Sequence, residues 1–321
     1  MSFTYSIIIP NYNGAKLLGA CLESISAQTL QPLETIVVDD ASNDNSIDYL
    51  SENYSWVRLI KRERNGGFTA ACNSGFDKAK GDVMILFNND AEAAPGWLEA
   101  IDHALQQRPE IDIVACKIML RDRPNVFHAA GDFYRRNGVP GNRGVWEEDK
   151  GQFDKAEEIF GPCGAAAAYK REALDEVRRD NEDGKVLDES LYMYLEDVDL
   201  NLRMHLRGKR CLYVPDALVY HQLSATGGGK RAAYQCGRNF LLVAVKDLPS
   251  GVLQQCLPGI IKAQLGYALT SLRLIKLDTE RARLKGQWHS LKALPRTLRQ
   301  RKRVQASCRV SRNYFEKLLQ D

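Results

Sequence analysis

The chain has 321 residues, 44% of them hydrophobic, so it can bury a full core in one large domain or two. Its eight cysteines are scattered without a C-x-x-C pair, so the pattern indicates neither a disulfide framework nor a zinc site. No basic leader precedes the short apolar run near the N-terminus, which excludes a typical secretory signal. The sequence therefore predicts a cytoplasmic protein with reduced thiols.

The net charge of +3 hides an uneven distribution along the chain. Residues 227–321 contain nineteen Lys and Arg against five Asp and Glu. Subtracting these from the totals of 44 and 41 leaves 25 basic and 36 acidic residues in 1–226. Such a split predicts a basic region that meets an anionic surface, either a membrane or a nucleic acid. Because no recognisable nucleic-acid-reading motif accompanies the basic region, we do not expect a nucleic-acid partner.

Short apolar, β-branched runs alternate with helical patterns through the first half of the chain. We expect strands at 6–9, 34–38, 56–60, 83–87 and 111–119, and helices at 15–27 and 68–80. This alternation predicts βαβ units, a parallel or mixed sheet and a nucleotide-binding type of fold. The small apolar run 161–169 suits a buried strand, a close approach of a ligand to the backbone, or both.

Polar residues follow three of these strands, where α/β sheets bind ligands. Asp39 and Asp40 follow the second strand, and an Asn88-Asn89-Asp90 tripeptide follows the fourth. The tripeptide offers oxygen ligands for a hard divalent cation. Basic residues and glycines at 62–67 suit a phosphate approaching backbone N–H groups at a helix start. Ordinary turn and capping chemistry remains the alternative for Asp39 and Asp40, and a turn for the tripeptide. The segment 62–67 lacks both the Walker spacing and a G-x-G-x-x-G motif, so by itself it is a weak signal.

Residues 188–221 are rich in carboxylates and then enter a predicted amphipathic helix, with Leu200, Met204 and Leu206 on its apolar side. Asp197 lies in the first turn of that helix, where the macrodipole favours an ionised carboxylate by up to about 1 kcal/mol. An acid held charged can accept a proton. The alternative is that these acids only favour the helix start.

The basic region reads as helices separated by a flexible loop at 224–229 and a break at 249–251. One helix has an apolar stripe, formed by Leu257, Ile261, Leu265, Ala268, Leu272 and Ile275. Lys262, Arg273 and Lys276 interrupt this run, so it is not expected to span a membrane. We expect the helix to lie in a membrane interface or to pack on the preceding domain or on a dimer partner.

Six segments in this order carry a resemblance to a known family: SIIIPNYNG, VVDDASNDNS, RNGGFTAACNSG, LFNND, GPCGAAAAYKRE and YLEDVDLNLRMHLRGKRCLYVPDALVYH. Together they resemble the inverting family 2 glycosyltransferases with a GT-A fold, and within them the rhamnosyltransferase-like branch. The resemblance implies a catalytic domain at 1–226, with a nucleotide-binding part at about 1–120 and an acceptor part at about 121–226. A helical extension would follow at 227–321.

The resemblance also implies roles for individual residues. The nucleotide sugar would lie near Pro10, Asn11, Asp40, Arg64, Asn65, Gly67 and Asn89. Asp90 and His221 would hold Mg²⁺ or Mn²⁺, and Asp197 would be the catalytic base. Gly164, Tyr194 and Glu196 would lie on the acceptor side. Asn88 departs from the family pattern, because it stands where an aspartate often precedes the metal ligand.

The implied activity is transfer of a sugar from a UDP, dTDP or GDP donor to a glycan or lipid-linked glycan during assembly of a bacterial surface polysaccharide. The enzyme would be peripheral at the inner face of the cell membrane, and it could form a homo-oligomer. Tyr192, Tyr194 and Trp146 would stack on an acceptor sugar or pack in the core. Two alternatives remain open: a sugar-1-phosphate nucleotidyltransferase and a non-catalytic module that binds nucleotide or membrane.

Overall fold

The computed structural model describes residues 3–222 and 228–321, so most of the loop predicted at 224–229 lies outside the described residues. The chain divides into two compact units. Unit 1 consists of Met1–Asp132, Asn142–Glu176 and Lys209–Thr226. Unit 2 consists of Phe133–Gly141, Val177–Gly208 and Gly227–Asp321. Residues 177–208 therefore group with the C-terminal helices, whereas the sequence analysis placed them with the catalytic domain.

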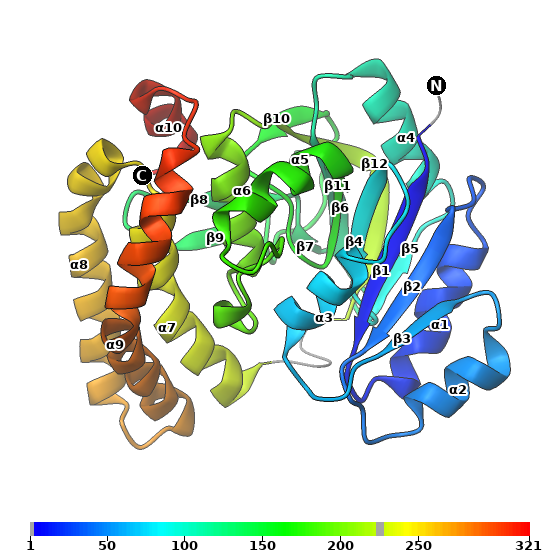
Figure 1. Cartoon of the computed structure of the whole chain (residues 1–321), viewed down its shortest axis with the longest axis horizontal. Coiled ribbons are helices and arrows are strands. Elements are labelled where there is room, and N and C mark those ends of the chain that lie inside the picture. Colours follow the sequence, from blue (N-terminus) through cyan, green and yellow to red (C-terminus); the bar gives the residue numbers. More distant parts are fainter. Residues whose placement is uncertain (1–2, 223–227) are drawn as a thin grey trace. The chain divides into compact units, whose positions relative to one another are not determined.

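Unit 1 is built on a mixed sheet with ten strands among the described residues, in the main order β10-β12-β6-β11-β4-β1-β2-β3 (Figure 1). The strands are β1 (Tyr5–Asn11), β2 (Glu34–Asp39), β3 (Arg58–Lys61), β4 (Val83–Phe87), β5 (Ala91–Ala93), β6 (Ile113–Leu120), β7 (Phe127–Ala129), β10 (Glu157–Ile159), β11 (Ala166–Lys170) and β12 (Cys211–His221). Strands β1 to β4 are parallel, and β11 lies antiparallel between β4 and β6. The predicted mixed α/β class is confirmed.

Helices cover both faces of this sheet: α1 (Ala15–Ser26), α2 (Ser46–Asn53), α3 (Phe68–Phe76), α4 (Trp97–Gln107) and α5 (Arg171–Val177). Successive side chains of a strand point to opposite faces. Ile7 and Ile9 of β1 therefore join the core that α1 and α4 complete. Ile8 points the other way, where a Cβ atom on Gly75 of α3 would lie 2.3 Å from its Cγ2 atom. Only glycine allows α3 to pack this closely on the sheet.

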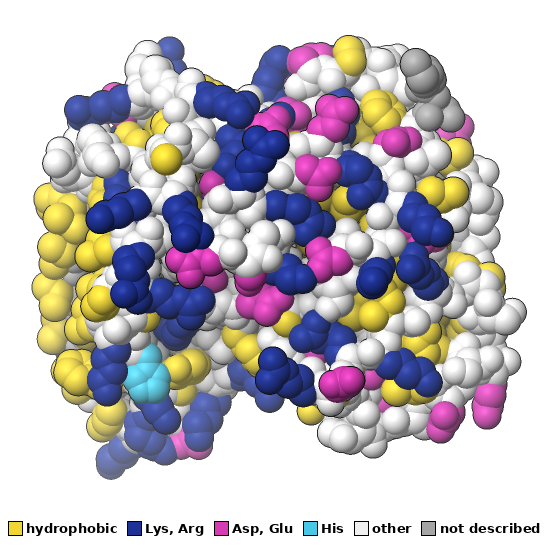
Figure 2. Space-filling view, in the orientation of Figure 1, with side chains coloured by type: hydrophobic (Ala, Val, Ile, Leu, Met, Phe, Trp, Pro, Cys, Tyr) yellow, Lys and Arg dark blue, Asp and Glu magenta, His cyan; other side chains and the backbone are white. Residues whose placement is uncertain are grey.

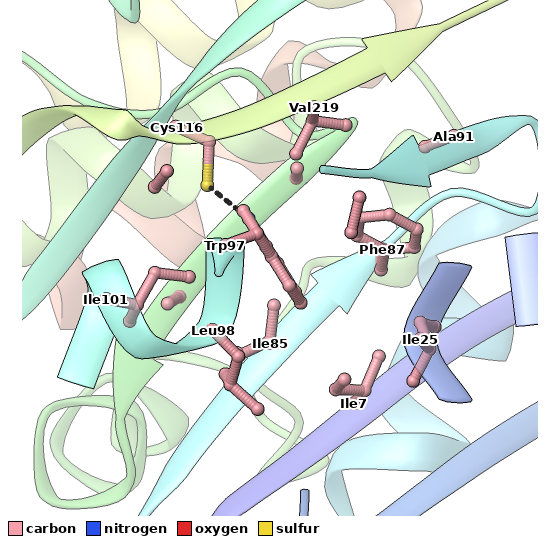
Figure 3. Close-up of a cluster of buried hydrophobic side chains, with 14 of the residues drawn as sticks. Ile7, Ile25, Ile85, Phe87, Ala91, Trp97, Leu98, Ile101, Cys116 and Val219 are labelled. Atoms are coloured by element: carbon pink, nitrogen blue, oxygen red, sulfur yellow. Dashed lines mark hydrogen bonds between the residues drawn. The ribbon is translucent and has the colours of Figure 1, made fainter. Parts of the chain in front are cut away.

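The core of unit 1 surrounds Trp97 at the start of α4 (Figure 3). Its ring lies 5.1 Å from that of Phe87 on β4, measured between centroids. Its indole N–H donates a hydrogen bond to the Cys116 sulfur on β6 at 3.3 Å, which satisfies a polar group that burial would otherwise leave unpaired. These contacts fix strands β4 and β6, whose neighbouring loops carry several of the predicted site residues.

Unit 2 consists mainly of helices α6 (Glu196–Leu206), α7 (Gly229–Asp247), α8 (Ser250–Arg273), α9 (Asp278–Ala306) and α10 (Arg312–Leu318). Two 3₁₀ turns, η1 (Arg178–Asp180) and η2 (Glu189–Leu191), precede α6, and β8 (Asp132–Tyr134) pairs with β9 (Pro140–Asn142). Helices α7 and α9 pack together through glycines. A Cβ atom on Gly286 of α9 would lie 2.2 Å from the carbonyl oxygen of Tyr234 on α7.

The predicted helix is present as α6, but nearly all of its residues are buried. The prediction that it has one apolar and one exposed polar side is therefore wrong. Its charged side chains are paired instead of exposed. Asp199 accepts hydrogen bonds from Arg203, with an Nη2–Oδ2 distance of 2.7 Å, and forms an ion pair with Lys246 of α7. Lys246 also contacts Asp188 at 2.6 Å. Burial alone would raise the pKa of Asp188, but the Lys246 ammonium group holds that pKa below its usual range.

The apolar stripe predicted on α8 is exposed in this structure, where hydrophobic side chains run along the helix (Figure 2). Leu265, Leu269 and Leu272 each expose more than half of their surface, at 58%, 56% and 57%. Among the described residues, no helix is both long and apolar enough to cross a bilayer. The stripe is therefore a surface feature of unit 2 and not a membrane span.

Candidate functional site

In unit 1, the carboxyl ends of β1, β2 and β4 bring several predicted donor-site residues together. Asn11, the last residue of β1, donates a hydrogen bond from Nδ2 to Asp39 Oδ2 at 3.0 Å. Asn89, which follows β4, donates from Nδ2 to Asn11 Oδ1 at 2.8 Å. Pro10 precedes Asn11 and pairs in register with Val38 of β2. Because the three strands are parallel, their ends form one polar edge, as the sequence predicted.

The Asp40 side chain, at this edge, binds the loop that precedes α3. Its carboxylate accepts hydrogen bonds from the backbone N–H groups of Gly66 and Gly67 at 3.0 and 2.8 Å, and from Arg62 Nε at 2.8 Å. In this structure these amide groups are therefore engaged by Asp40, so their binding to a phosphate stays a prediction. Arg64 and Asn65, in the same loop, are exposed.

The predicted metal ligands of unit 1 are adjacent. Strand β12 ends at His221, which pairs with Ala91 at the start of β5, and this pairing brings His221 beside Asp90. The Nε2 atom of His221 lies 3.0 Å from Asp90 Oδ1. Asn88 places its side-chain nitrogen 3.3 Å from the same Nε2 atom. Both predicted ligands are nearly buried.

This pair fits a divalent cation that takes part of its coordination from a bound diphosphate and from water. Among the described residues, no group of three or more His, Cys, Asp and Glu side chains has a metal-binding arrangement. The protein would therefore supply two ligands, Asp90 and His221. The buried Nδ1 atom of His221 has no hydrogen-bond partner among the described residues.

His128 of β7 was missed by the sequence analysis. Its ring stacks on that of His221, with centroids 4.8 Å apart and an interplanar angle of 11°. Burial, followed by the charge of the neighbouring His221, lowers the pKa of His128 to about 3, so its imidazole stays neutral at physiological pH. The stacking fixes the ring plane of His221. A lone histidine in a three-residue strand gives no recognisable signal in the sequence.

In unit 2, the segment before α6 has an unusual backbone. Tyr192, Tyr194 and Leu195 adopt positive φ angles of 66°, 63° and 68°, which side chains with a Cβ rarely adopt. Asn239 of α7 holds this segment in place. Its Nδ2 atom lies within hydrogen-bond distance of the carbonyl oxygens of Leu191, Met193 and Tyr194, at 3.1, 3.2 and 2.8 Å. Strain of this kind concentrates at functional sites.

The strained segment delivers Glu196 and Asp197 to the first turn of α6. Glu196 is buried, whereas Asp197 is partly exposed and accepts a hydrogen bond from the Val198 N–H at 2.8 Å. Burial and the neighbouring Asp197 charge raise the pKa of Glu196 to about 8. Glu196 therefore holds its proton to higher pH than an ordinary glutamate, and Asp197 is the more exposed carboxyl group of the two.

The other acceptor-side predictions fall in different units. Tyr194 lies beside Glu196 in unit 2, and burial raises the pKa of its hydroxyl group. Gly164 lies in unit 1, in the turn before β11, where the Ala165 carbonyl accepts a hydrogen bond from the Asn88 N–H at 3.0 Å. Asn239 and Lys246, which hold the acidic segment, were also missed. The sequence does contain an indication that Lys246 is buried, because this lysine follows the apolar run LLVAV on one helix.

Comparisons with known proteins place this geometry in context. The family model described as Glycosyl transferase family 2 matches residues 6–178. An N-acetylglucosaminyl-diphospho-decaprenol L-rhamnosyltransferase from Mycobacterium tuberculosis is 24% identical over 310 residues, which cover 88% of this chain and 96% of that protein. The matches to the first curated relatives span only 33% and 44% of those proteins.

Two solved structures share the fold. TarS residues 1–349 from S. aureus, in complex with UDP-GlcNAc, superposes with a TM-score of 0.59 at 18% identity, covering 95% of this chain and 84% of that one. The mannosyltransferase PcManGT from Pyrobaculum calidifontis, in complex with GDP-Man and Mn²⁺, gives a TM-score of 0.55 at 19% identity, covering 93% and 88%. The fold is therefore the predicted GT-A type.

Replacing Glu196 with Gln should flatten the dependence of stability on pH. The raised pKa means that the folded state keeps its proton more tightly than the unfolded state. The stability contributed by protonated Glu196 is complete below about pH 4.5 and is lost as the pH rises to about 8. Thermal unfolding between these limits should show a smaller fall in melting temperature for Glu196→Gln than for wild type.

The matched control is Glu52→Gln, which changes an exposed glutamate on α2 and should unfold like the wild type at every pH. An identical pH dependence in Glu196→Gln and wild type would contradict the assigned protonation state.

Proposed function

The chain belongs to glycosyltransferase family 2, and we propose that it is an inverting, metal-dependent glycosyltransferase. It would move a sugar from a nucleotide-diphosphate donor to a hydroxyl group of a glycan or lipid-linked glycan during assembly of a bacterial surface polysaccharide. The observation that carries the proposal is the contact between Asp90 and His221, 3.0 Å apart at the carboxyl edge of the sheet in unit 1.

In this proposal, Asp90 and His221 hold Mg²⁺ or Mn²⁺, and the polar edge formed by Asn11 and Asn89 faces the donor. When bound, the cation stabilises the negative charge that develops on the departing nucleoside diphosphate. Asn88 is neutral, so it adds no charge to the site, but its side chain lies next to His221 and restrains the ring. Pro10, Asp40, Arg64, Asn65 and Gly67 complete the proposed donor region.

Asp197 is the proposed catalytic base. Inversion requires one base that takes the proton from the acceptor hydroxyl group as its oxygen attacks the anomeric carbon. The bond to the diphosphate breaks as the new glycosidic bond forms, and the proton ends on the Asp197 carboxylate. The difference in burial supports this assignment, because Asp197 is partly exposed whereas Glu196 is buried. Gly164, Glu196 and Tyr194 are the proposed acceptor-side residues.

The names of the relatives suggest candidates for the two substrates. TarS was solved with UDP-GlcNAc and PcManGT with GDP-Man and Mn²⁺, so a UDP, dTDP or GDP sugar is proposed as the donor. The mycobacterial relative is named for an acceptor with a sugar on a lipid diphosphate, and we propose the same class of acceptor here. Rhamnose as the transferred sugar rests on that relative alone.

Family membership weighs against the two alternatives left open by the sequence. A sugar-1-phosphate nucleotidyltransferase would release pyrophosphate from a nucleoside triphosphate, whereas the matched family transfers the sugar itself. A non-catalytic module would not require the strained backbone that presents Asp197 at the start of α6. Transfer of a sugar is therefore the reaction that the residues of both units support best.

We further propose that α8 and α9 place the enzyme at the inner face of the cell membrane. Residues 250–306 carry twelve Lys and Arg against two Asp and Glu. Each basic residue near anionic lipid contributes about 1 kcal/mol, and the exposed leucines of α8 would enter the interface. A homo-oligomer that buries the same stripe is the competing arrangement.

Nucleotide binding should depend on both the metal and Asp90. We expect one of UDP, dTDP, GDP and CMP to raise the melting temperature of the wild type in the presence of Mn²⁺, because a ligand at a hundred times its Kd adds about 2.7 kcal/mol of stability. Asp90→Ala should lose this shift, whereas Asp216→Ala, which alters an exposed aspartate of unit 1, should keep it. A shift that persists without Mn²⁺ and in Asp90→Ala would contradict the metal site.

Asp197→Asn should abolish sugar transfer while the metal-dependent nucleotide shift survives, because Asn cannot accept the proton of the acceptor. A loss of about 10²-fold to 10⁴-fold is typical when a general base is removed. Release of the nucleoside diphosphate in the presence of acceptor measures the rate. Asp48→Asn, which changes an exposed aspartate in the first turn of α2, is the control and should react normally. Full activity in Asp197→Asn would eliminate it as the base.

Wild-type protein should sediment with vesicles that contain phosphatidylglycerol but not with pure phosphatidylcholine vesicles. The double variant Leu265→Glu, Leu269→Glu places two carboxylates on the exposed stripe and should remain in the supernatant. Leu33→Glu, an equally exposed leucine of unit 1, should sediment like the wild type. Absence of lipid binding together with a dimer that the double variant disrupts would favour the oligomer instead.

A further inference from the structure

A cavity of about 540 Å³ lies in unit 1 beside the candidate metal residues, a volume suited to a small-molecule ligand. Its lining residues are Leu120, Arg121, Asp122, Arg123, Trp146 and Gln222. Leu120 is paired with His221 across β6 and β12. The Arg121 N–H donates to the His221 carbonyl, and the Gln222 N–H donates to the Asp90 carbonyl, each at 3.0 Å. Three residues that line the cavity are therefore paired through their backbones with the proposed metal ligands.

Trp146 forms an exposed aromatic wall of this cavity. Its side chain is 59% exposed although exposure of a large apolar surface is costly, and its φ angle of 69° is rare for a bulky residue. A hydrogen bond from the Trp146 N–H to the Phe127 carbonyl at 3.0 Å holds this conformation. An indole presented in this way offers a flat surface on which the C–H face of a sugar ring can pack.

Two guanidinium groups give the cavity its charge. Arg121 is engaged by Glu92, with an Nη2–Oε1 distance of 2.7 Å. Arg123 lies over the Trp146 ring, 5.5 Å from its centroid, and no carboxylate of the described residues forms an ion pair with it. Arginine is well suited to phosphate because its planar group donates two parallel hydrogen bonds. Arg123 is thus a cation held beside an aromatic platform and still available for an anion.

We propose that this cavity binds a sugar phosphate, the glycosyl-phosphate end of the acceptor. The proposal rests on the proposed function, because it takes the neighbouring edge of the sheet as the donor site. The sugar ring packs on Trp146, the phosphate accepts hydrogen bonds from Arg123, and the Asp122 carboxylate accepts from sugar hydroxyl groups. Residues 121–123 and Trp146, which lie within the part that the resemblance assigns to the acceptor, then form the acceptor-binding wall of unit 1.

Titration calorimetry on the full chain tests this proposal with four probes: glucose 1-phosphate, N-acetylglucosamine 1-phosphate, glucose and inorganic phosphate. The wild type should bind at least one sugar phosphate at millimolar concentration or below, and more tightly than glucose or inorganic phosphate. Trp146→Ala and Arg123→Ala should each weaken that binding by about tenfold or more, as loss of one charge-assisted hydrogen bond predicts for Arg123. Trp56→Ala removes another exposed tryptophan of unit 1 and should bind like the wild type.

Three results would overturn the proposal. These are the absence of sugar-phosphate binding to the wild type, equal binding by Trp146→Ala and Arg123→Ala, and binding of inorganic phosphate as tight as that of the sugar phosphates. A parallel measurement of the Mn²⁺-dependent nucleotide shift separates this inference from the proposed function. If both variants lose that shift, the cavity belongs to the donor. If the wild type shows no Mn²⁺-dependent nucleotide shift, the proposed donor site is contradicted, whether or not sugar phosphates bind to the cavity.

Discussion

A buried carboxylate must be paired with a cation, accept several hydrogen bonds or take up a proton, and this constraint organises both units of the chain. Asp40 accepts two backbone N–H groups and Arg62. Asp188 and Asp199 share the Lys246 ammonium group. Glu196 has no such cation among the residues that the structure describes, and burial raises its pKa. The contacts of Asp40, and those of Asp188 and Asp199, hold neighbouring segments in place. Glu196 instead lies beside Asp197, the proposed catalytic base.

The sequence predicted the sheet well because buried parallel strands are short, continuous apolar runs. The run at 83–87 coincides with β4, and the predicted end of the second strand lies one residue from the end of β2. The edge formed by Asn11, Asn89 and Asp90 could also be predicted, because strand order places these residues at one end of a parallel sheet. The identities of their neighbours depended on pairing between distant strands, which sequence periodicity does not encode.

The acidic segment was harder to predict for the same reason. Its carboxylates were visible in the sequence, but their partners lie on α7, about fifty residues further along the chain. Without Lys246 and Arg203, the alternation of charged and apolar residues in α6 resembles that of an exposed helix. Asn239 gave no signal at all, since an asparagine that binds three carbonyl oxygens looks like any other in the sequence.

The close contact between α7 and α9 links a distant position to this segment. Helix α7 carries both Asn239 and Lys246, and it approaches α9 where Gly286 leaves no room for a Cβ atom. An alanine at 286 would force the two helices apart and shift the groups that hold the acidic segment. A side chain at position 286 would therefore disturb the acidic segment from a distance, even though glycine has no chemical role there.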